Sequence, residues 1–213
     1  MPYVLGIDLS GPVNIADTAV ACFRVDGQWL VHEFTRAGTD DEAIRELIAL
    51  VSAGDEVTVG IDSPLSYQVG GGDRPSDTEL RLRLRRAGLP AGTVMSPTLT
   101  RMVYLTLRGV SVARTIMLEV PIAHVVEVHP GGVMALRGAP IDAVKTFKRS
   151  TAARTCLLDW LKKRGLKKLP RDAASDHIVA AYACALGAWR WRLGDTAWVT
   201  RAEPPHRPYD YAC

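Results

Sequence analysis

The segment YVLGIDLSGP at residues 3–12 decides the class of fold, because it has the pattern of a buried strand that runs into a turn. Residues 3–9 form a short run of apolar, β-forming side chains, and Ser10, Gly11 and Pro12 close it. We therefore place the first strand here, with Asp8 near its C-terminal end.

The next residues predict a three-strand meander followed by a parallel strand. Two strand-like runs, residues 18–25 and 28–35, flank the dipeptide Asp26-Gly27, which is typical of an antiparallel hairpin. Apolar residues then recur at helical spacing over residues 40–52, and a fourth strand follows at residues 56–61 (EVTVGI). Because strand–helix–strand connections are right-handed crossovers, this strand should run parallel to the first.

The second half of the chain predicts one more strand and several helices. Residues 123–128 (AHVVEV) form the fifth strand. The helices are expected at residues 76–87, 98–119, 150–163 and 173–192. The prediction is an α/β fold with a central mixed sheet of five strands, flanked by helices, in one domain of residues 1–193. Residues 194–213 contain three prolines and are expected to form a tail that packs on this domain or extends from it.

Four acidic residues fall at one edge of the predicted sheet. Asp8, Asp62 and Glu127 lie near the C-terminal ends of the three parallel strands, where open α/β sheets bind ligands. Asp176 begins the last helix, which is apolar enough to lie on the sheet. If the first and fourth strands are neighbours, Asp8 and Asp62 are roughly 5 Å apart.

Carboxylates at that distance repel one another unless a cation neutralises them. An all-oxygen set of ligands suits Mg²⁺ or Mn²⁺. The four acids are therefore predicted to be metal ligands. Taken singly, each has an alternative role, in ending a turn or capping a helix.

Basic residues gather in one part of the chain, although the net charge is only +3. Residues 142–172 hold ten Lys or Arg residues against three Asp, and a smaller cluster lies at residues 81–86. Clustered positive charge favours a polyanionic substrate such as DNA or RNA. The alternative is that these residues form solvated helix faces.

The motifs around the four acids resemble a known family. They are Gly6-Ile7-Asp8, Gly60-Ile61-Asp62-Ser63-Pro64, Glu127-Val128-His129-Pro130 and Asp176 at the head of an alanine-rich helix. In order and spacing they resemble the domain-of-unknown-function 429 family, which is described as predicted nucleases with a ribonuclease H-like fold. The stretches RPSD at residues 74–77 and KTFKRSTAAR at residues 145–154 also resemble segments of that family.

The resemblance implies a ribonuclease H-like fold and a two-metal site that hydrolyses phosphodiester bonds of nucleic acid. The resemblance also implies that the matching acids, Asp8, Asp62, Glu127 and Asp176, are the catalytic residues of this site. The residues expected to contact the substrate are Ser10, Ser63, Arg74, Asp77, His129, Lys145, Lys148 and Arg154.

The chain departs from the family pattern at two positions. Family members often have a Glu after the His-Pro pair, where this chain has Gly131, and an Asp three residues before the last acid, where it has Ala173. Asp172, four residues before Asp176, is a candidate to replace the second of these on the same helix face.

Two alternatives to a nuclease stay open. Residues 6–11 (GIDLSG) also resemble the first phosphate loop of actin-like ATPases, so a phosphate- or nucleotide-binding module is one alternative. Those proteins use two lobes, however, and 213 residues make only one. The other alternative is a non-catalytic member of the fold, which the absent Glu after Pro130 favours. A serine hydrolase is set aside, because the chain has no GxSxG motif.

Composition sets the remaining expectations. With 47% apolar and 23% charged residues, the chain is a globular protein rather than a disordered or fibrous one. Its four cysteines are far apart and form no CxxC pair, which predicts neither a zinc site nor a disulfide framework, and hence a cytoplasmic setting. The longest uncharged apolar run, residues 178–189, is shorter than the ~20 residues that span a bilayer, and no signal-peptide pattern opens the chain. The oligomeric state is left open.

Overall fold

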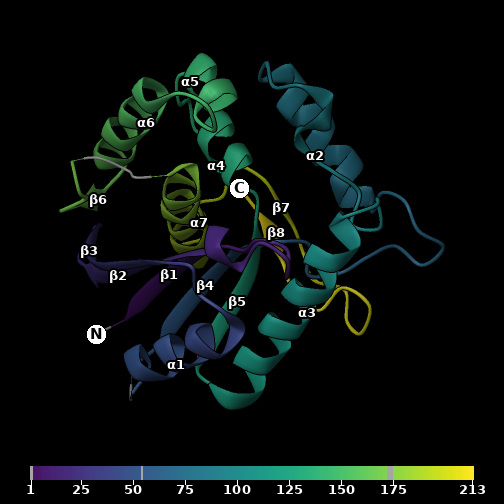
Figure 1. Ribbon diagram of the computed structural model, residues 1–213, viewed down its shortest axis with the longest axis horizontal. Helices are drawn as coiled ribbons and strands as arrows, with labels where there is room; N and C mark the ends of the chain where they lie inside the picture. The colour runs from purple at the N-terminus through teal and green to yellow at the C-terminus, as the bar shows by residue number, and fades with distance from the viewer. Residues whose placement is uncertain (1, 54, 172–174) are drawn as a thin grey trace.

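One mixed sheet forms the centre of the molecule. Figure 1 shows the computed structural model, which describes residues 2–53, 55–171 and 175–213. In these residues the sheet has eight strands in the order β6-β3-β2-β1-β4-β5-β8-β7. The strands are β1 (Tyr3–Asp8), β2 (Ala19–Asp26), β3 (Trp29–Ala37), β4 (Val57–Asp62), β5 (Ala123–Val128), β6 (Leu166–Lys167), β7 (Val199–Thr200) and β8 (Tyr211–Ala212).

Helices cover both faces of this sheet (Figure 1). They are α1 (Asp41–Val51), α2 (Pro75–Arg86), α3 (Met102–Glu119), α4 (Pro130–Leu136), α5 (Ile141–Thr146), α6 (Thr151–Lys163) and α7 (Asp176–Arg192), with short 3-10 turns η1 (Ile15–Asp17) and η2 (Ala91–Thr93). On one face, Ile44 of α1 and Ile116 of α3 pack with the apolar side chains of β1 and β4. On the other face α7 lies directly on the strands, and α2, α4, α5 and α6 contribute to the same core. Within the described residues, no helix is both long and apolar enough to cross a membrane.

The α/β class and the central strands are confirmed. β1, β2 and β3 form the antiparallel meander, with Asp26 and Gly27 at the hairpin turn. β4 runs parallel to β1, and β5 runs parallel to β4. All four cysteines are free, as their spacing predicts.

The prediction of five strands was wrong, because the sheet also includes β6, β7 and β8. Each of these strands has two residues, which is too short to show an alternating pattern in the sequence. β8 pairs parallel with β5, so part of the Pro-containing tail lies inside the sheet. Tyr211 and Cys213 are buried there. The helices α4 and α5 were also missed.

Glycine allows α7 to approach the sheet closely. A Cβ atom at Gly6 of β1 would overlap the backbone of Ala181 and Ala185, and one at Gly60 of β4 would meet the Cys184 carbonyl oxygen at 2.6 Å. Only a residue without a side chain fits at these two points. This contact fixes the start of α7 above the C-terminal ends of β1 and β4.

Candidate active site

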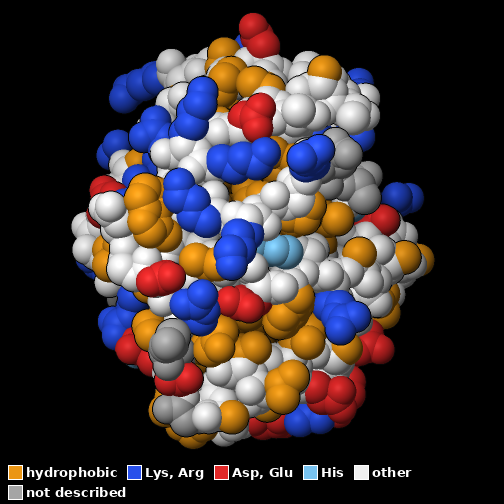
Figure 2. Space-filling view, turned by 90° about the vertical axis from the view of Figure 1, so that its left-hand side faces the viewer, with side chains coloured by type: hydrophobic (Ala, Val, Ile, Leu, Met, Phe, Trp, Pro, Cys, Tyr) orange, Lys and Arg blue, Asp and Glu red, His pale blue; other side chains and the backbone are white. Residues whose placement is uncertain are grey.

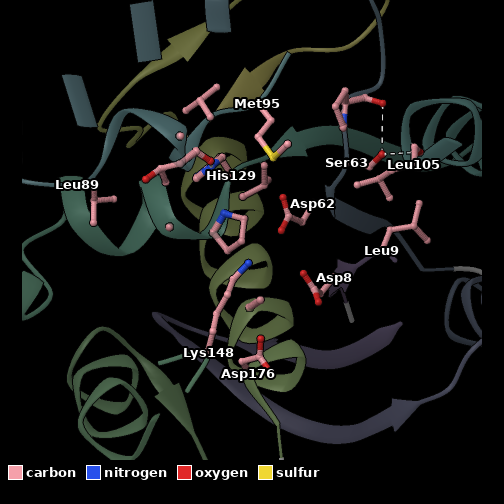
Figure 3. Close-up of a pocket in the computed structure, with 18 of the residues that line it drawn as sticks. Asp8, Leu9, Asp62, Ser63, Leu89, Met95, Leu105, His129, Lys148 and Asp176 are labelled. Atoms are coloured by element: carbon pink, nitrogen blue, oxygen red, sulfur yellow. Dashed lines mark hydrogen bonds between the residues drawn. The ribbon is translucent and has the colours of Figure 1, made fainter. Parts of the chain in front are cut away.

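Two carboxylates lie side by side at the C-terminal edge of the sheet. Asp8 ends β1 and Asp62 ends β4, and the two residues are paired in register on these parallel strands. Both line a cavity of about 670 Å³ (Figure 3). Burial and the neighbouring Asp8 carboxylate raise the pKa of Asp62 well above its ordinary value. The pair is therefore electrostatically unfavourable in the absence of a cation.

A histidine that the sequence analysis did not select completes this edge. The Nδ1 atom of His177 lies 2.6 Å from Asp8 Oδ2. Its Nε2 atom lies 4.0 Å from carboxylate oxygens of both Asp17 and Asp176. The hydrogen bond to Asp8 is the main cause of the raised pKa of His177. The sequence signal for His177 is its position directly after the predicted ligand Asp176.

Asp176 occupies the first position of α7 and lines the same cavity (Figure 3). The helix is capped by Ser175, whose hydroxyl oxygen accepts from the Ile178 N–H at 3.3 Å. The Asp176 carboxylate is thus not used as the cap. It lies within reach of His177 and faces the cavity with Asp8.

Glu127 lies in a different electrostatic environment. Its carboxylate accepts two hydrogen bonds from the guanidinium of Arg74, at 2.6 and 2.8 Å, and one from the Leu65 N–H at 2.9 Å. Arg74 also pairs with Asp77 at 2.7 Å and lies 5.1 Å from the centre of the Tyr211 ring. Arg74, Asp77 and Glu127 are at most 4% exposed. We call these three residues the buried ion cluster. In this structure the predicted metal ligand Glu127 and the predicted substrate contacts Arg74 and Asp77 bind one another.

Burial raises the pKa of Glu127, although the neighbouring Arg74 acts in the opposite direction. The carboxylate is nevertheless supplied with three donors, so it has little tendency to bind a further cation. Among the described residues, no group of three or more His, Cys, Asp or Glu side chains is arranged to hold a metal ion. The Asp8–Asp62 pair, with Asp176 nearby, does fit a hard cation, because none of these carboxylates forms an ion pair with a Lys or Arg side chain among the described residues, and carboxylate oxygens are the ligands that such ions prefer. Asp172 and Ala173 lie outside the described residues.

Three of the predicted substrate contacts line the cavity but already have partners. Ser10 hydrogen-bonds to the Asn14 carbonyl oxygen at 2.6 Å and Ser63 to the Leu105 carbonyl oxygen at 3.1 Å. His129 caps α4: its Nδ1 accepts from the Gly132 N–H at 2.8 Å, and its Nε2 lies 3.0 Å from the Thr93 carbonyl oxygen. Nε2 must therefore carry the proton and donate it. Burial lowers the pKa of His129, which keeps the ring neutral.

Basic side chains line another part of the cavity. Lys145, Lys148 and Arg149 lie there, and the positive charge of Lys148 acts on Asp62 (Figure 3). Arg149 was not among the predicted contacts. Arg154 was, but it is not a lining residue, because its guanidinium hydrogen-bonds to the Phe147 carbonyl oxygen and the Thr151 hydroxyl.

The remaining wall of the cavity is apolar. It is formed largely by Leu9, Leu89, Met95, Met102, Leu105 and Phe147. Figure 3 shows Met95 and Leu9 near the two aspartates and Leu89 farther away, beyond His129. Such a wall can hold an organic group, such as a base or a sugar, beside a charged phosphate.

Comparison with known proteins places this site within a family. The family model described as "Protein of unknown function (DUF429)" matches residues 6–205. The chain belongs to the DUF429 family. The DUF429 match includes all four acids and the whole of α7, and it ends before β8. No curated protein matches the chain. This family description names no activity.

Proposed function

We propose that this DUF429 protein is a Mg²⁺- or Mn²⁺-dependent phosphodiesterase that hydrolyses nucleic acid at the Asp8–Asp62 pair. The observation that carries the proposal is the pairing of these two carboxylates in register, at the edge of a 670 Å³ cavity that Lys148 also lines. Acids and bases converging on one cavity suit a cation-assisted reaction of a phosphate ester. The ribonuclease H-like fold implied by the resemblance belongs to the same proposal, and the meander followed by two parallel strands supports it.

The roles of the residues follow from their positions. Asp8 and Asp62 would hold the cation, with Asp176 as the next available carboxylate. A bound divalent cation supplies Lewis-acid activation of water and of the phosphoryl group. Lys148 is placed to bind a phosphate oxygen, and His177 holds the Asp8 carboxylate in place. The buried ion cluster fixes β5 against α2 at the floor of the cavity.

The first experiment measures Mn²⁺ binding by calorimetry and Mn²⁺-dependent cleavage of single- and double-stranded DNA and RNA. Asp62→Asn is expected to lower cleavage at least a hundredfold and to weaken Mn²⁺ binding. Asp26→Asn, purified in the same way, is the matched control, since Asp26 is exposed at the hairpin turn and Asn-Gly also suits that turn. Equal cleavage by wild type and Asp62→Asn, or no Mn²⁺ binding to the wild type, contradicts the proposal.

A second candidate is a binding module without catalysis. The specific observation in its favour is that the carboxylate of Glu127 already forms an ion pair with Arg74, so one of the four predicted metal ligands is occupied by a protein cation. This candidate predicts cation-independent binding of nucleic acid or nucleotide to the wild type, with no cleavage under any of the conditions above. An assay of ATP hydrolysis on the same samples tests the actin-like alternative.

A further inference from the structure

The cations of this chain fall into two groups that differ in their partners. Away from residues 142–171, many arginines form ion pairs with acids. Such pairs are Arg24–Glu33, Arg45–Glu119, Arg81–Asp73, Arg83–Glu79, Arg192–Glu56, Arg201–Asp210 and Arg207–Glu203. Ion pairs of this kind are what an ordinary solvated surface shows.

Residues 142–171 do not follow this pattern. The segment has two acids, Asp142 and Asp159, and each pairs with a lysine of its own helix. Five exposed cations form neither an ion pair nor a side-chain hydrogen bond with any described residue. They are Lys148, Arg149, Lys163, Lys168 and Arg171, and we call them the unpaired cations. Arg164, which is also exposed, differs from them because it donates to the Arg137 carbonyl oxygen. Positive charge without local compensation attracts a polyanion.

A second hollow lies at the far end of the same segment. It has a volume of about 390 Å³, and Trp29, Lys163, Arg164 and Arg190 are among the residues that line it. Trp29 is 39% exposed, and the Lys167 ammonium lies 3.9 Å from the centre of its ring. An exposed tryptophan among cations is the combination that proteins use to bind bases next to phosphates.

The helix α6 connects the two hollows. Lys148 and Arg149 line the active-site cavity just before α6 begins, and Lys163 lines the second hollow where the helix ends. Figure 1 shows α5, α6 and β6 following one another along one side of the molecule. Figure 2 looks at that side, and Lys and Arg side chains gather across its upper and middle part. The 13 residues of α6 span about 20 Å, which corresponds to roughly six base steps of a nucleic acid strand.

We propose that α6 and β6 form a second binding surface for nucleic acid, in which the unpaired cations bind phosphates and Trp29 contacts a base. The substrate is then a chain of several nucleotides that extends from the active-site cavity to Trp29, rather than a mononucleotide. Only the role in cleavage rests on the function proposed above, because binding at this surface needs neither the metal nor Asp62.

The test is fluorescence anisotropy with labelled single-stranded oligonucleotides of 4 and 12 nucleotides, in EDTA, over a range of salt concentrations. The wild type is expected to bind the 12-mer at least tenfold more tightly than the 4-mer. Lys163→Glu with Lys168→Glu should remove most of this difference. The slope of the logarithm of the binding constant against the logarithm of the salt concentration should become shallower by about two. Trp29→Leu should weaken binding of the 12-mer about fivefold or more, because one base loses its aromatic contact.

Arg85→Glu with Arg86→Glu is the control of equal charge change, because both arginines are exposed in the last turn of α2, which belongs to neither α6 nor β6. It should keep the length dependence. The proposal of a second binding surface is contradicted if this control weakens binding as much as the double lysine variant does. It is also contradicted if the wild type binds the 4-mer and the 12-mer with equal affinity. If Trp29→Leu binds the 12-mer with unchanged affinity, Trp29 does not contact the oligonucleotide. These results are separate from cleavage by Asp62→Asn, which tests the active site alone.

Discussion

Replacing Arg74 by Met tests how much the buried ion cluster at the floor of the cavity contributes to the stability of the fold. The Arg74 side chain donates five hydrogen bonds, to Asp77, Ser66 and Glu127, and the residue is 2% exposed. Arg74→Met removes all five and leaves two buried carboxylates without a cation. Glu127→Gln removes one negative charge and leaves Arg74 paired with Asp77.

The two changes should therefore differ in cost. With both acids ionised, the formal charge of the buried ion cluster is −1, from one cation and two anions; Arg74→Met makes it −2, whereas Glu127→Gln makes it 0. Removing one partner of a buried ion pair typically costs 3–5 kcal/mol, so about 4 kcal/mol is expected for Arg74→Met. For Glu127→Gln about 2 kcal/mol is expected, because the loss of charge-assisted hydrogen bonds is partly offset by a smaller desolvation penalty. In a chain of 213 residues, 4 kcal/mol corresponds to a fall in Tm of roughly 10 °C.

The assay is urea unfolding at pH 7 in EDTA, followed by circular dichroism. Both variants should lower the midpoint with an unchanged m-value, and Arg74→Met should have the lower midpoint. If Arg74→Met does not fold, Arg74→Lys replaces it, since lysine keeps the charge but cannot bind both carboxylates with a planar fork. Equal costs for Glu127→Gln and the Arg74 variants, or costs below about 1 kcal/mol, refute the role assigned to the cluster.

The same Glu127→Gln protein distinguishes the two roles considered for Glu127. If Glu127 only holds the floor, the affinity for Mn²⁺ changes less than threefold while stability falls. A loss of affinity of tenfold or more with little loss of stability would instead make Glu127 a metal ligand, as its position at the end of β5 predicted.

Three further results are expected. Gly6→Ala should cost about 3 kcal/mol in urea unfolding, because the new methyl group overlaps the backbone of α7, and a cost below about 1 kcal/mol contradicts that contact. Asp62→Asn should raise the urea midpoint at pH 7 in EDTA, because burial and Asp8 disfavour the ionised Asp62, and a lower midpoint contradicts this. Hydrogen bonds from Arg81 are the main cause that lowers the pKa of Asp73 to about 2, so the stability this acid contributes is present near neutral pH and is lost as the pH falls from about 4 to 2. In thermal unfolding, Asp73→Asn should therefore be less stable than the wild type at pH 6 and as stable as the wild type near pH 2. If the difference in stability between the two proteins is the same at both pH values, the lowered pKa of Asp73 is not its cause.

Local patterns and the handedness of the strand–helix–strand connection predicted the central sheet and the parallel β1 and β4 strands. The long-range side-chain pairs and the two-residue strands did not emerge from the sequence. The Asp26-Gly27 turn and the apolar run before Asp62 each carry their signal within a few residues. The ion pair between Arg74 and Glu127 joins side chains 53 positions apart, so no spacing rule indicates it. The strand β8 consists of two residues that become a strand only because β5 offers a free edge. His177 was missed because a single histidine has no pattern of its own.

The repeated tripeptide Gly-Ile-Asp explains why the acids meet at the start of α7. Side chains alternate along a strand, so Gly6 and Asp8 face α7, while Ile7 enters the opposite core. Asp8 lies two residues beyond the contact of Gly6 with Ala181, about 6.6 Å along the strand. From Ala181 back to the start of α7 is five residues, or about 7.5 Å of helix. These two lengths nearly agree, so the contact that requires glycine also brings the start of α7 level with Asp8, where the Nδ1 atom of His177 lies 2.6 Å from its carboxylate. The same register in β4 places Asp62 beside them, and the geometry of the site therefore follows from the close packing of one helix on two glycines.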